Sequence, residues 1–290
     1  MLRIALPKGS LEEQTMRLFK QADLEVKKGQ RDYNPVISDP RIDSVKILRP
    51  QEIPKYIEEN YFDLGISGLD WVMESDADVE VIADLPYSKT GSGNVRLVVA
   101  VPEASEITDV KDIKAGSRVT TEYPNLTKQY FEKLGIQIEM HYSYGASEAK
   151  VPELMDVLID LTETGATLRK NRLRIVGTII ESSTKLLANK ESWADGEKRK
   201  AMEELRTLLL GVIEARGKVL LTMNAPEAKV EDVVNALPAM KKPTVSKLYG
   251  LDYYAIETVV EKKDVNVLIP KLKENGAEDI LEMRIDKIVR

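Results

Sequence analysis

Short apolar segments alternate with amphipathic segments through the first two thirds of the chain, and this alternation constrains the fold most. Residues 2–6, 44–48 and 64–67 have the length and composition of strands. The segment after 44–48 has apolar residues at helical spacing, including Ile53 and Ile57. Strands that alternate with helices at this pitch form βαβ units, so the sequence predicts an α/β sheet.

The ends of two helices can be placed from their flanking residues. Ser10 is followed three residues later by Glu13, which is the pattern of a capping box, so we expect a helix over residues 11–22. Gly135 stands where a later helix should stop, since glycine commonly follows a helix C-terminus.

A turn-rich segment, residues 86–94, separates two α/β runs. At the end of the second run, residues 173–189 form two apolar halves split by the polar residues ESST, as expected of a chain that returns from one lobe to another. We therefore predict two lobes with a ligand cleft between them. Residues 1–88 and 180–212 form lobe I, and residues 89–179 form lobe II.

The last part of the chain has a different pattern. A long amphipathic helix is expected over residues 197–216. After it, strands and helices follow in the order βαββαβ within about 75 residues, which is the order of a ferredoxin-like unit. The predicted fold class is α/β, with a two-lobed core like that of periplasmic binding proteins and a C-terminal ferredoxin-like domain over residues 213–290.

Composition excludes several kinds of site. The chain has no cysteine and one histidine, His141, so it has no thiolate metal site and no histidine metal cluster, and we expect His141 to be structural. A net charge of −6 argues against binding to nucleic acid. No apolar run approaches the roughly 20 residues of a membrane span, and the first residues lack the apolar core of a signal peptide, so we expect a cytoplasmic protein.

The segment VLIDLTETGATL, residues 157–168, carries the most informative polar pattern. Asp160 lies at the end of an apolar element, where a side chain can face a cleft at the sheet's carboxyl edge. The residues that follow are Thr162, Glu163, Thr164, Gly165, Ala166 and Thr167. Hydroxyls, a glycine and a helix start near Ala166 suit a sugar phosphate. Ordinary capping chemistry explains the same residues, so the pattern alone leaves both interpretations open.

This segment resembles the phosphoribosyl-diphosphate loop of phosphoribosyltransferases. With the opening LRIALPKGSL it is similar to ATP phosphoribosyltransferase, the first enzyme of histidine biosynthesis. Further stretches agree in order: ILRPQEIPKYIEENYFDLGISGLDWV, SRVTTEYPNLTKQYFEKLGI, GASEAKVPELMDVLIDLTETGATL and MNAPEAKVEDVVNALPAMKKPTVSKL. The resemblance spans nearly the whole chain. One departure lies in EAKVPELMD, which is shorter than the family segment and lacks its glycine, so the contacts of Glu148 are uncertain.

The resemblance implies the long form of this enzyme, with two catalytic lobes and a regulatory domain that senses histidine. It implies that N1 of ATP attacks C1 of 5-phosphoribosyl 1-diphosphate and that pyrophosphate leaves. Such a displacement needs Mg²⁺ and cations on the pyrophosphate rather than a strong base. The Mg²⁺ ligands are not assigned. The resemblance also implies feedback inhibition by histidine and a homo-oligomer, expected to be a hexamer.

Further site residues follow from the same resemblance. We expect Asp160 and Arg49 to be catalytic and the segment 160–167 to bind the phosphoribosyl donor. The residues expected to bind the nucleotide are Lys8, Arg49, Asp70, Arg96 and Tyr123. The alternatives are a solvated turn lysine at position 8, a surface ion pair at position 49 and a helix cap at position 70. Arg96, in an otherwise apolar strand, would be costly to bury without a partner or ligand.

Two residues of the last domain, Asn224 and Thr244, match family stretches associated with histidine binding. The alternative for both is a strand-end polar residue at a subunit contact. Two other functions stay open on the residues alone. One is a solute-binding protein without chemistry, and the other is a phosphoribosyltransferase that uses another base or amine.

Overall fold

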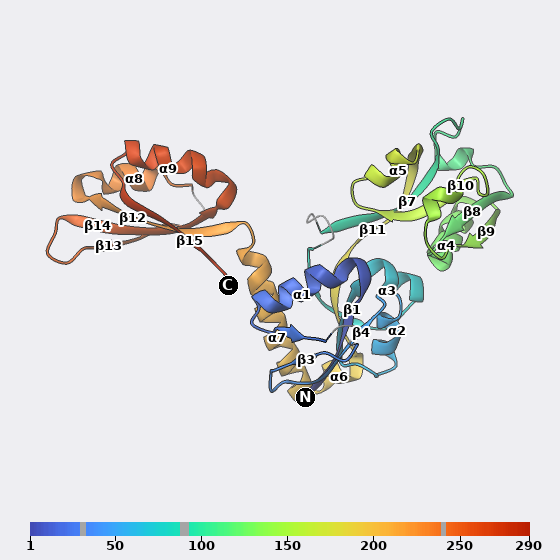
Figure 1. Cartoon of the computed structure of the whole chain (residues 1–290), viewed down its shortest axis with the longest axis horizontal. Coiled ribbons are helices and arrows are strands. Elements are labelled where there is room, and N and C mark those ends of the chain that lie inside the picture. The colour runs from blue at the N-terminus through green and yellow to red at the C-terminus, as the bar shows by residue number, and fades with distance from the viewer. Residues whose placement is uncertain (30–32, 88–92, 239–241) are drawn as a thin grey trace. The chain divides into compact units, whose positions relative to one another are not determined.

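The computed structural model describes residues 1–29, 33–87, 93–238 and 242–290. The chain divides into two units, Met1–Arg206 and Thr207–Arg290, and each is described by itself (Figure 1). Residues 88–92, which make up most of the predicted turn-rich segment 86–94, lie outside the described residues.

The first unit contains one mixed sheet with helices packed on it. Its strands are β1 (Leu2–Pro7), β4 (Ile42–Leu48), β5 (Leu64–Gly68), β6 (Glu80–Asp84), β7 (Asn94–Pro102), β8 (Ser117–Thr121), β9 (Ile138–Tyr142), β10 (Val157–Thr162) and β11 (Leu173–Ala188), with a separate pair β2 (Val26–Lys27) and β3 (Val36–Ile37). Its helices are α1 (Glu12–Gln21), α2 (Ile53–Glu58), α3 (Leu69–Ser75), α4 (Pro124–Leu134), α5 (Ala166–Lys170) and α6 (Lys190–Ala194), and α7 (Gly196–Ala215) continues into the second unit. The strand order is β4-β1-β5-β11-β7-β10-β8-β9, with β6 also paired to β11.

Strand β11 joins the two halves of this sheet (Figure 1). Its first part pairs antiparallel with β7, from Leu173 to Ser183. Its last part pairs with β5 and β6, from Thr184 to Ala188. The two apolar halves noted in the sequence are therefore one continuous strand, and the polar residues between them lie where the backbone passes from one lobe to the other.

The two lobes repeat one topological unit. β1 pairs in parallel with β4 and β5, and β8 pairs in parallel with β9 and β10. In lobe I, Arg3 donates its backbone N–H, Nε and a terminal N–H to the carboxylate of Asp63, at 2.8, 3.1 and 3.0 Å. In lobe II, Arg118 makes the same three bonds to Asp156, at 2.9, 3.2 and 2.7 Å. Arg3 lies on β1 and Asp63 directly precedes β5, whereas Arg118 lies on β8 and Asp156 directly precedes β10.

The predicted capping box at the first helix is wrong. A 3₁₀ turn, Gly9–Leu11, precedes α1, and neither Leu11 nor any other residue caps α1 through its side chain at this end. The N–H of Gly9 instead donates to Glu12 Oε2 at 3.3 Å. The helix itself begins within one residue of its predicted start, because the apolar spacing that drives packing does not depend on the cap. Gly135 ends α4 in the left-handed conformation, φ 70°, as predicted.

The second unit has the predicted order βαββαβ. Its elements are β12 (Lys218–Pro226), α8 (Val230–Ala236), β13 (Thr244–Lys247), β14 (Tyr253–Glu261), α9 (Val265–Glu274) and β15 (Glu278–Arg284). The sheet order β13-β14-β12-β15 and its antiparallel pairing are those of a ferredoxin-like domain. Alternate residues of β12, such as Leu221 and Met223, are buried with Leu268 and Leu272 of α9. The predicted fold class is confirmed.

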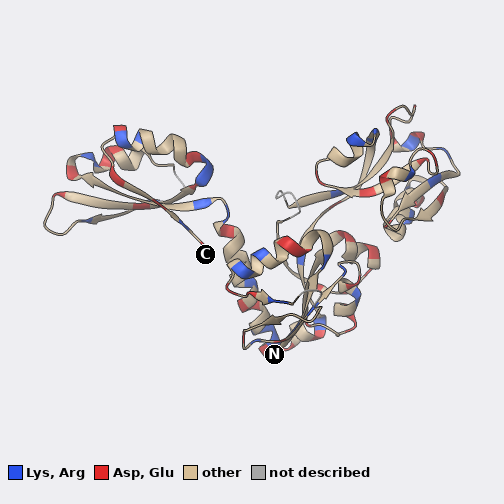
Figure 2. Ribbon diagram, in the orientation of Figure 1, with Lys and Arg blue, Asp and Glu red and all other residues tan. Residues whose placement is uncertain are grey.

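Charged residues of both signs are interspersed along the helices and strands of both units (Figure 2). Within the part of the chain that the structure describes, no helix is long and apolar enough to cross a membrane.

The ion pair of Arg3 and Asp63 is the first target for a stability test. Burial would raise the pKa of Asp63, but hydrogen bonds from Arg3 and Lys198 lower it well below its usual range. The Asp63 side chain is 1% exposed, whereas its counterpart Asp156 is 42% exposed. We expect Asp63→Asn to cost about 3 kcal/mol of unfolding free energy, because it leaves two cations without their buried partner.

Asp156→Asn is the matched control and should cost about 1 kcal/mol or less, since exposed pairs are screened. Urea unfolding followed by fluorescence of Trp71 and Trp193, both in the first unit, measures the difference. Because the folded state favours ionised Asp63, its stabilisation is present above pH about 4 and is lost as the pH falls toward the lowered pKa. Equal costs for the two substitutions would contradict this prediction.

Candidate active site

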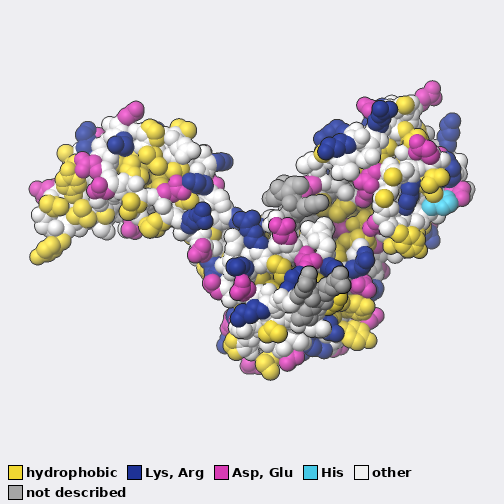
Figure 3. Space-filling view, viewed as in Figure 1, with side chains coloured by type: hydrophobic (Ala, Val, Ile, Leu, Met, Phe, Trp, Pro, Cys, Tyr) yellow, Lys and Arg dark blue, Asp and Glu magenta, His cyan; other side chains and the backbone are white. Residues whose placement is uncertain are grey.

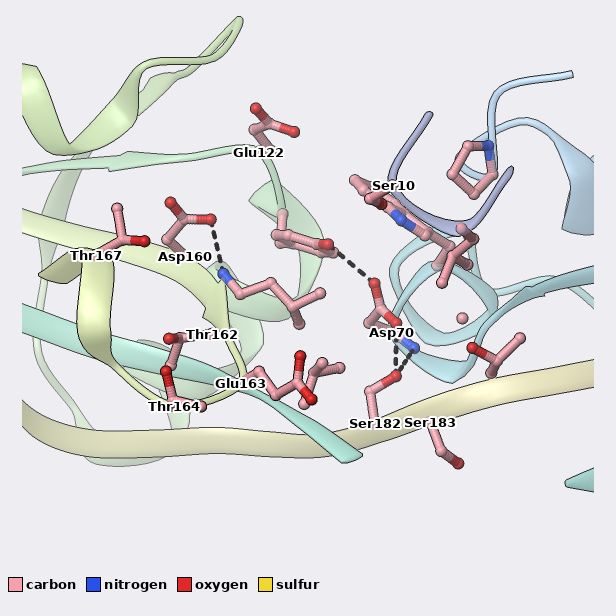
Figure 4. A pocket seen from close by; sticks show the side chains of 18 of the residues that line it. Ser10, Asp70, Glu122, Asp160, Thr162, Glu163, Thr164, Thr167, Ser182 and Ser183 are labelled. Atoms are coloured by element: carbon pink, nitrogen blue, oxygen red, sulfur yellow. Dashed lines mark hydrogen bonds between the residues drawn. The ribbon is translucent and has the colours of Figure 1, made fainter. Parts of the chain in front are cut away.

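A cavity of about 540 Å³ in the first unit brings together residues from both lobes (Figure 4). The predicted site residues that line it are Asp70, Tyr123, Asp160, Thr162, Glu163, Thr164, Ala166 and Thr167. They come from the ends of β5, β8 and β10 and from the segments that follow these strands. The carboxyl ends of parallel strands are the usual place for ligands in such sheets. Ser182 and Thr184 of β11 also line the cavity.

The loop between β10 and α5 has its own internal hydrogen bonds. Thr162 Oγ1 accepts from the N–H of Gly165 at 2.9 Å, and Thr164 Oγ1 accepts from the N–H of Ala166 at 3.3 Å. Gly165 has φ 70°, a conformation that glycine adopts without strain. Two hydroxyls of the predicted phosphate loop thus bind the backbone at Gly165 and Ala166, where α5 begins. Thr167 is exposed at the cavity, and no hydrogen bond holds its hydroxyl among the described residues.

Asp160 lies at the end of β10 with its carboxylate on the cavity wall (Figure 4). Its Oδ1 accepts from the N–H of Leu161 at 2.7 Å. Burial, together with the nearby carboxylates Glu148 and Glu122, raises the pKa of Asp160 to about 6. Both of these glutamates line the same cavity. The wall around Asp160 is therefore acidic, and a hydroxyl-rich or cationic group is its natural partner.

Asp70 connects the two lobes at the cavity. It is 2% exposed, and its carboxylate accepts from Ser182 Oγ at 2.5 Å and from Tyr123 OH at 2.9 Å. The predicted alternative, a side-chain cap of α3, is wrong because Gly68 takes that position without a side-chain bond. A Cβ at Gly68 would lie 2.1 Å from Asp70 Oδ1, so only glycine leaves room for this carboxylate. Burial raises the pKa of Asp70 more than the two hydroxyls lower it.

The ring of Tyr123 stacks on Trp71. The ring centroids are 4.2 Å apart and the planes meet at 22°. Tyr123 comes from lobe II and Trp71 from α3 of lobe I. Both line the cavity, so a flat aromatic surface lies beside the buried Asp70 carboxylate. Burial and Asp70 raise the pKa of Tyr123 well above its usual value, so its hydroxyl donates a hydrogen bond at neutral pH.

A second contact between the lobes lies next to this pair. Glu74 of α3 accepts from the N–H groups of Asn125 and Leu126, both at 2.9 Å. N–H groups at the start of a helix have no partner within the helix, so here a residue of lobe I caps a helix of lobe II. The Asn125 side chain adds to this contact by donating to the Glu74 carbonyl at 2.9 Å.

Lys8 and Arg49 lie outside the main cavity. They line a smaller adjoining cavity of about 260 Å³, which shares Ser10, Pro50 and Gln51 with the larger one. Lys8 is exposed, and its Nζ donates to Tyr33 OH at 2.9 Å and lies over the ring of Tyr33. Arg49 is exposed and has no ion pair among the described residues, which excludes its predicted alternative as a surface ion pair there.

Arg96 lines neither of these two cavities. It lies on β7 opposite Thr162 of β10 and Glu181 of β11. Arg96 is half-buried and has no ion pair within the described part of the chain. His141 lies on the edge strand β9, where Nε2 contacts Glu139 Oε1 at 3.1 Å, and it is not part of the cavity.

Asn224 and Thr244 lie in the second unit on the sheet face opposite its helices. Glu257 of β14 pairs with Thr244 of β13 on one side and with Thr222 of β12 on the other, so these three residues share a face of the sheet. Asn224 lies two residues after Thr222 on β12 and is therefore on the same face. Asn224 donates to Asp279 Oδ2 at 3.0 Å, and Thr244 is exposed. The two residues thus share a face without contacting each other.

Sequence reasoning missed several cavity residues. Glu122 directly precedes Tyr123, but no motif or spacing in the sequence marks it as a site residue. Ser182 was noted only as part of the polar residues ESST between two apolar halves. Trp71 and Gln51 gave no signal, because nothing local shows that they face a distant loop. Glu148, left uncertain by the shortened segment, does line the cavity. No group of three or more acidic or histidine side chains is arranged to hold a metal ion in the described ranges.

The comparisons with known proteins agree with this arrangement. The family model of ATP phosphoribosyltransferase matches residues 49–211. The chain is 47% identical over 288 residues to the ATP phosphoribosyltransferase of Desulforudis audaxviator, with 99% of each chain covered. The chain belongs to the ATP phosphoribosyltransferase family. The predicted resemblance is confirmed, and with it the enzyme class, a pentosyltransferase of histidine biosynthesis.

Other comparisons extend the match to the whole chain. The model described as HisG, C-terminal domain, matches residues 215–287, as expected of a long-form ATP phosphoribosyltransferase. The enzyme of Pelotomaculum thermopropionicum is 46% identical over 288 residues, with 99% of each chain covered. A solved structure, the ATP phosphoribosyl transferase (HisG:HisZ) complex from Thermotoga maritima, contains a chain that is 27% identical with a TM-score of 0.64. That match covers 74% of this chain and 99% of the other.

The raised pKa of Asp160 predicts how stability changes with pH. Its folded state favours the protonated carboxyl, so the wild type should lose unfolding free energy as the pH rises from about 4 to about 6. We expect Asp160→Asn to lack this loss and to gain up to about 3 kcal/mol relative to wild type over that range. Tryptophan fluorescence during urea unfolding at each pH measures it. Asp43→Asn, at an exposed position of β4, is the control, and parallel curves for D160N and wild type would contradict the prediction.

Proposed function

We propose that this chain transfers the phosphoribosyl group of 5-phosphoribosyl 1-diphosphate to N1 of ATP, with release of pyrophosphate. The observation that carries the proposal is the cavity itself, which places the 160–167 loop opposite Asp70 and Tyr123 in a chain of this family. A bond forms between N1 and C1 of the ribose while the bond from C1 to the diphosphate oxygen breaks. Holding both reactants in line can supply about 7–11 kcal/mol of the barrier.

The donor side of the proposed site is the β10–α5 loop. The free hydroxyl of Thr167 would hold the 5-phosphate, and Thr162 and Thr164 shape the loop by accepting from the N–H groups of residues 165 and 166. Asp160 would accept a hydrogen bond from a ribose hydroxyl, and Glu163 and Glu148 line the same wall. Carboxylates near the ribose also stabilise the positive charge that develops on the ring as pyrophosphate leaves.

The nucleotide side is the surface made by Trp71, Tyr123 and Asp70. An adenine ring can stack on the aromatic pair, and its amino group can donate to the Asp70 carboxylate. Lys8 and Arg49, in the adjoining cavity, would bind phosphates and stabilise the leaving pyrophosphate. Arg96 is the least supported member of the set because it lines neither cavity. No group in this scheme acts as a strong base, which suits a nucleophile with a lone pair at N1.

Mg²⁺ is proposed as a companion of the donor rather than a resident ion. Magnesium usually binds through substrate phosphates and one or two carboxylates, with water completing its shell. The described residues show no group of three or more acidic or histidine side chains that could hold a metal ion. A diphosphate that carries Mg²⁺ is a better leaving group because its negative charge is reduced.

For the second unit we propose histidine-dependent inhibition and self-association. Asn224 and Thr244 share an open sheet face with the exposed apolar residues Leu281 and Met283, which are 58% and 43% exposed. Hydrophobic side chains are visible on the surface of this unit (Figure 3). Exposed apolar patches often mark contacts between subunits. The hexamer, a cytoplasmic location and the lobe boundaries 1–88 with 180–212 and 89–179 also stay proposals.

The test of the proposed reaction is continuous absorbance of the purified protein with ATP, the phosphoribosyl donor, Mg²⁺ and pyrophosphatase. Substitution at N1 changes the ultraviolet spectrum of adenine, so the signal should rise only when both substrates are present. Added histidine should suppress it. A signal that ignores histidine would remove the inhibition proposal, and no signal would remove the transferase in favour of a binding protein. Turnover without ATP would indicate another phosphoribosyltransferase.

The donor loop is tested by Thr167→Val, which keeps the shape of the side chain and removes its hydroxyl. We expect the KM for the phosphoribosyl donor to rise about 10- to 100-fold, because a hydrogen bond to a charged group contributes about 1.5–3 kcal/mol. The KM for ATP should stay within about twofold of wild type. Thr178→Val, at an exposed position of β11 outside the cavity, is the matched control. Equal changes in both KM values would remove Thr167 from the donor site.

A further inference from the structure

A buried hydroxyl network lies on the segment 143–150, which also carries the cavity residue Glu148. Ser143 and Ser147 are 0% and 4% exposed, and their Oγ atoms are 2.6 Å apart. Lys150 Nζ donates to Ser143 Oγ at 2.6 Å. Lys150 is half-buried, and its ammonium makes no ion pair with any described residue. A half-buried ammonium held by a neutral hydroxyl is unusual, because such a charge is normally paired.

The network holds a turn with an unfavourable backbone. Ser147–Lys150 is a single 3₁₀ turn, preceded by Gly145 with φ 108° and Ala146 with φ 47°. A left-handed alanine costs about 1–2 kcal/mol and persists only where its surroundings hold it. Ser143 at one side and Lys150 at the end of the turn are joined by the 2.6 Å bond. Glu148 lies on this turn, so the same bond sets where its side chain enters the cavity.

The charges near the turn explain why a cation is useful there. Glu122, Glu148 and Asp160 all line the cavity. Burial raises the pKa of Glu122, Lys150 and Arg49 lower it, and Glu148 raises it. Arg49 is exposed and belongs to lobe I, whereas Lys150 is half-buried and belongs to the same lobe as the three carboxylates. Among the described residues, Lys150 is thus the cation of lobe II whose charge acts on this acidic wall.

We propose that Lys150 is a positioning residue for the phosphoribosyl donor. Anchored by Ser143, it holds the turn 147–150 so that Glu148 faces the ribose hydroxyls, and it balances the negative charge of the wall. Lys150 does not line the cavity and touches no reacting atom. The inference rests on the proposed function and adds a residue that acts through Glu148.

The test is steady-state kinetics of the full chain with three substitutions of lysine. Lys150→Met should raise the KM for the donor about tenfold and leave the KM for ATP within about twofold. Lys150→Arg should restore most of the donor affinity, because it keeps the charge and a donor group. Lys133→Met, at an exposed position of α4, is the matched loss of one positive charge and should behave as wild type.

The pH profile separates this role from a merely structural one. The charges of Lys150, Arg49 and Glu148 act on the pKa of Glu122, and those of Glu148 and Glu122 act on the pKa of Asp160. Removal of the Lys150 charge makes these carboxylates harder to ionise, so the acid limb of kcat/KM for the donor should move to higher pH in K150M. The limb should stay in place in K150R and K133M.

Ser143→Ala keeps the charge and removes the anchor. S143A should raise the KM for the donor without moving the acid limb of the pH profile. If K150M does not fold, the donor KM of S143A tests the proposal in its place. A donor KM that is unchanged in K150M, or in S143A when K150M is insoluble, would overturn the inference. Equal increases for both substrates in K150M would also overturn it. Each of these results leaves the proposed function intact, whereas the absence of turnover by the wild type removes the proposed function itself.

Discussion

The site depends on one extended backbone segment that belongs to both lobes. β11 forms sheet hydrogen bonds with β7 in lobe II and with β5 and β6 in lobe I, so the lobes are joined by a strand as well as by loops. Ser182 lies where the strand passes between them, and its hydroxyl binds the Asp70 carboxylate. Tyr123 of lobe II binds the same carboxylate, and Glu74 of lobe I caps α4 of lobe II. The cavity therefore has walls from both lobes with a shared, hydrogen-bonded floor.

Burial tends to raise the pKa of Asp63, Asp70 and Asp160 alike, and their hydrogen-bond partners decide the outcome. Asp63 is fully buried but receives hydrogen bonds from two cations, so its pKa falls. Asp70 and Asp160 receive hydrogen bonds only from neutral groups, so desolvation prevails and their pKa values rise. The paired carboxylate ties strands together, and the unpaired ones line the cavity. Carboxylates with raised pKa values gathered in a cleft are typical of functional sites.

The second lobe repeats the first in a way that the sequence does not reveal. Arg3 with Asp63 and Arg118 with Asp156 occupy equivalent places and make the same three bonds. The segments around them share no pattern beyond an arginine near a strand start and an aspartate before another strand. Sequence spacing differs between the pairs, 60 residues in one and 38 in the other, because the connections between the strands differ in length. Only pairing in space makes the repeat visible.

The sequence by itself determined the elements and the class of the protein. Apolar spacing predicted β1, β4, β5, α2 and the βαββαβ order of the second unit, since these patterns follow from which faces must be buried. The segment 157–168, with matching stretches along the chain, indicated the family and the donor loop. Tertiary structure alone decided that Glu122, Trp71 and Ser182 join this loop, that Glu12 rather than Glu13 serves the first helix, and that Lys8 and Arg49 line a neighbouring cavity. Local sequence patterns indicate which residues of a segment are buried. A site, in contrast, is made by segments that are distant in sequence and come together only when the sheet forms.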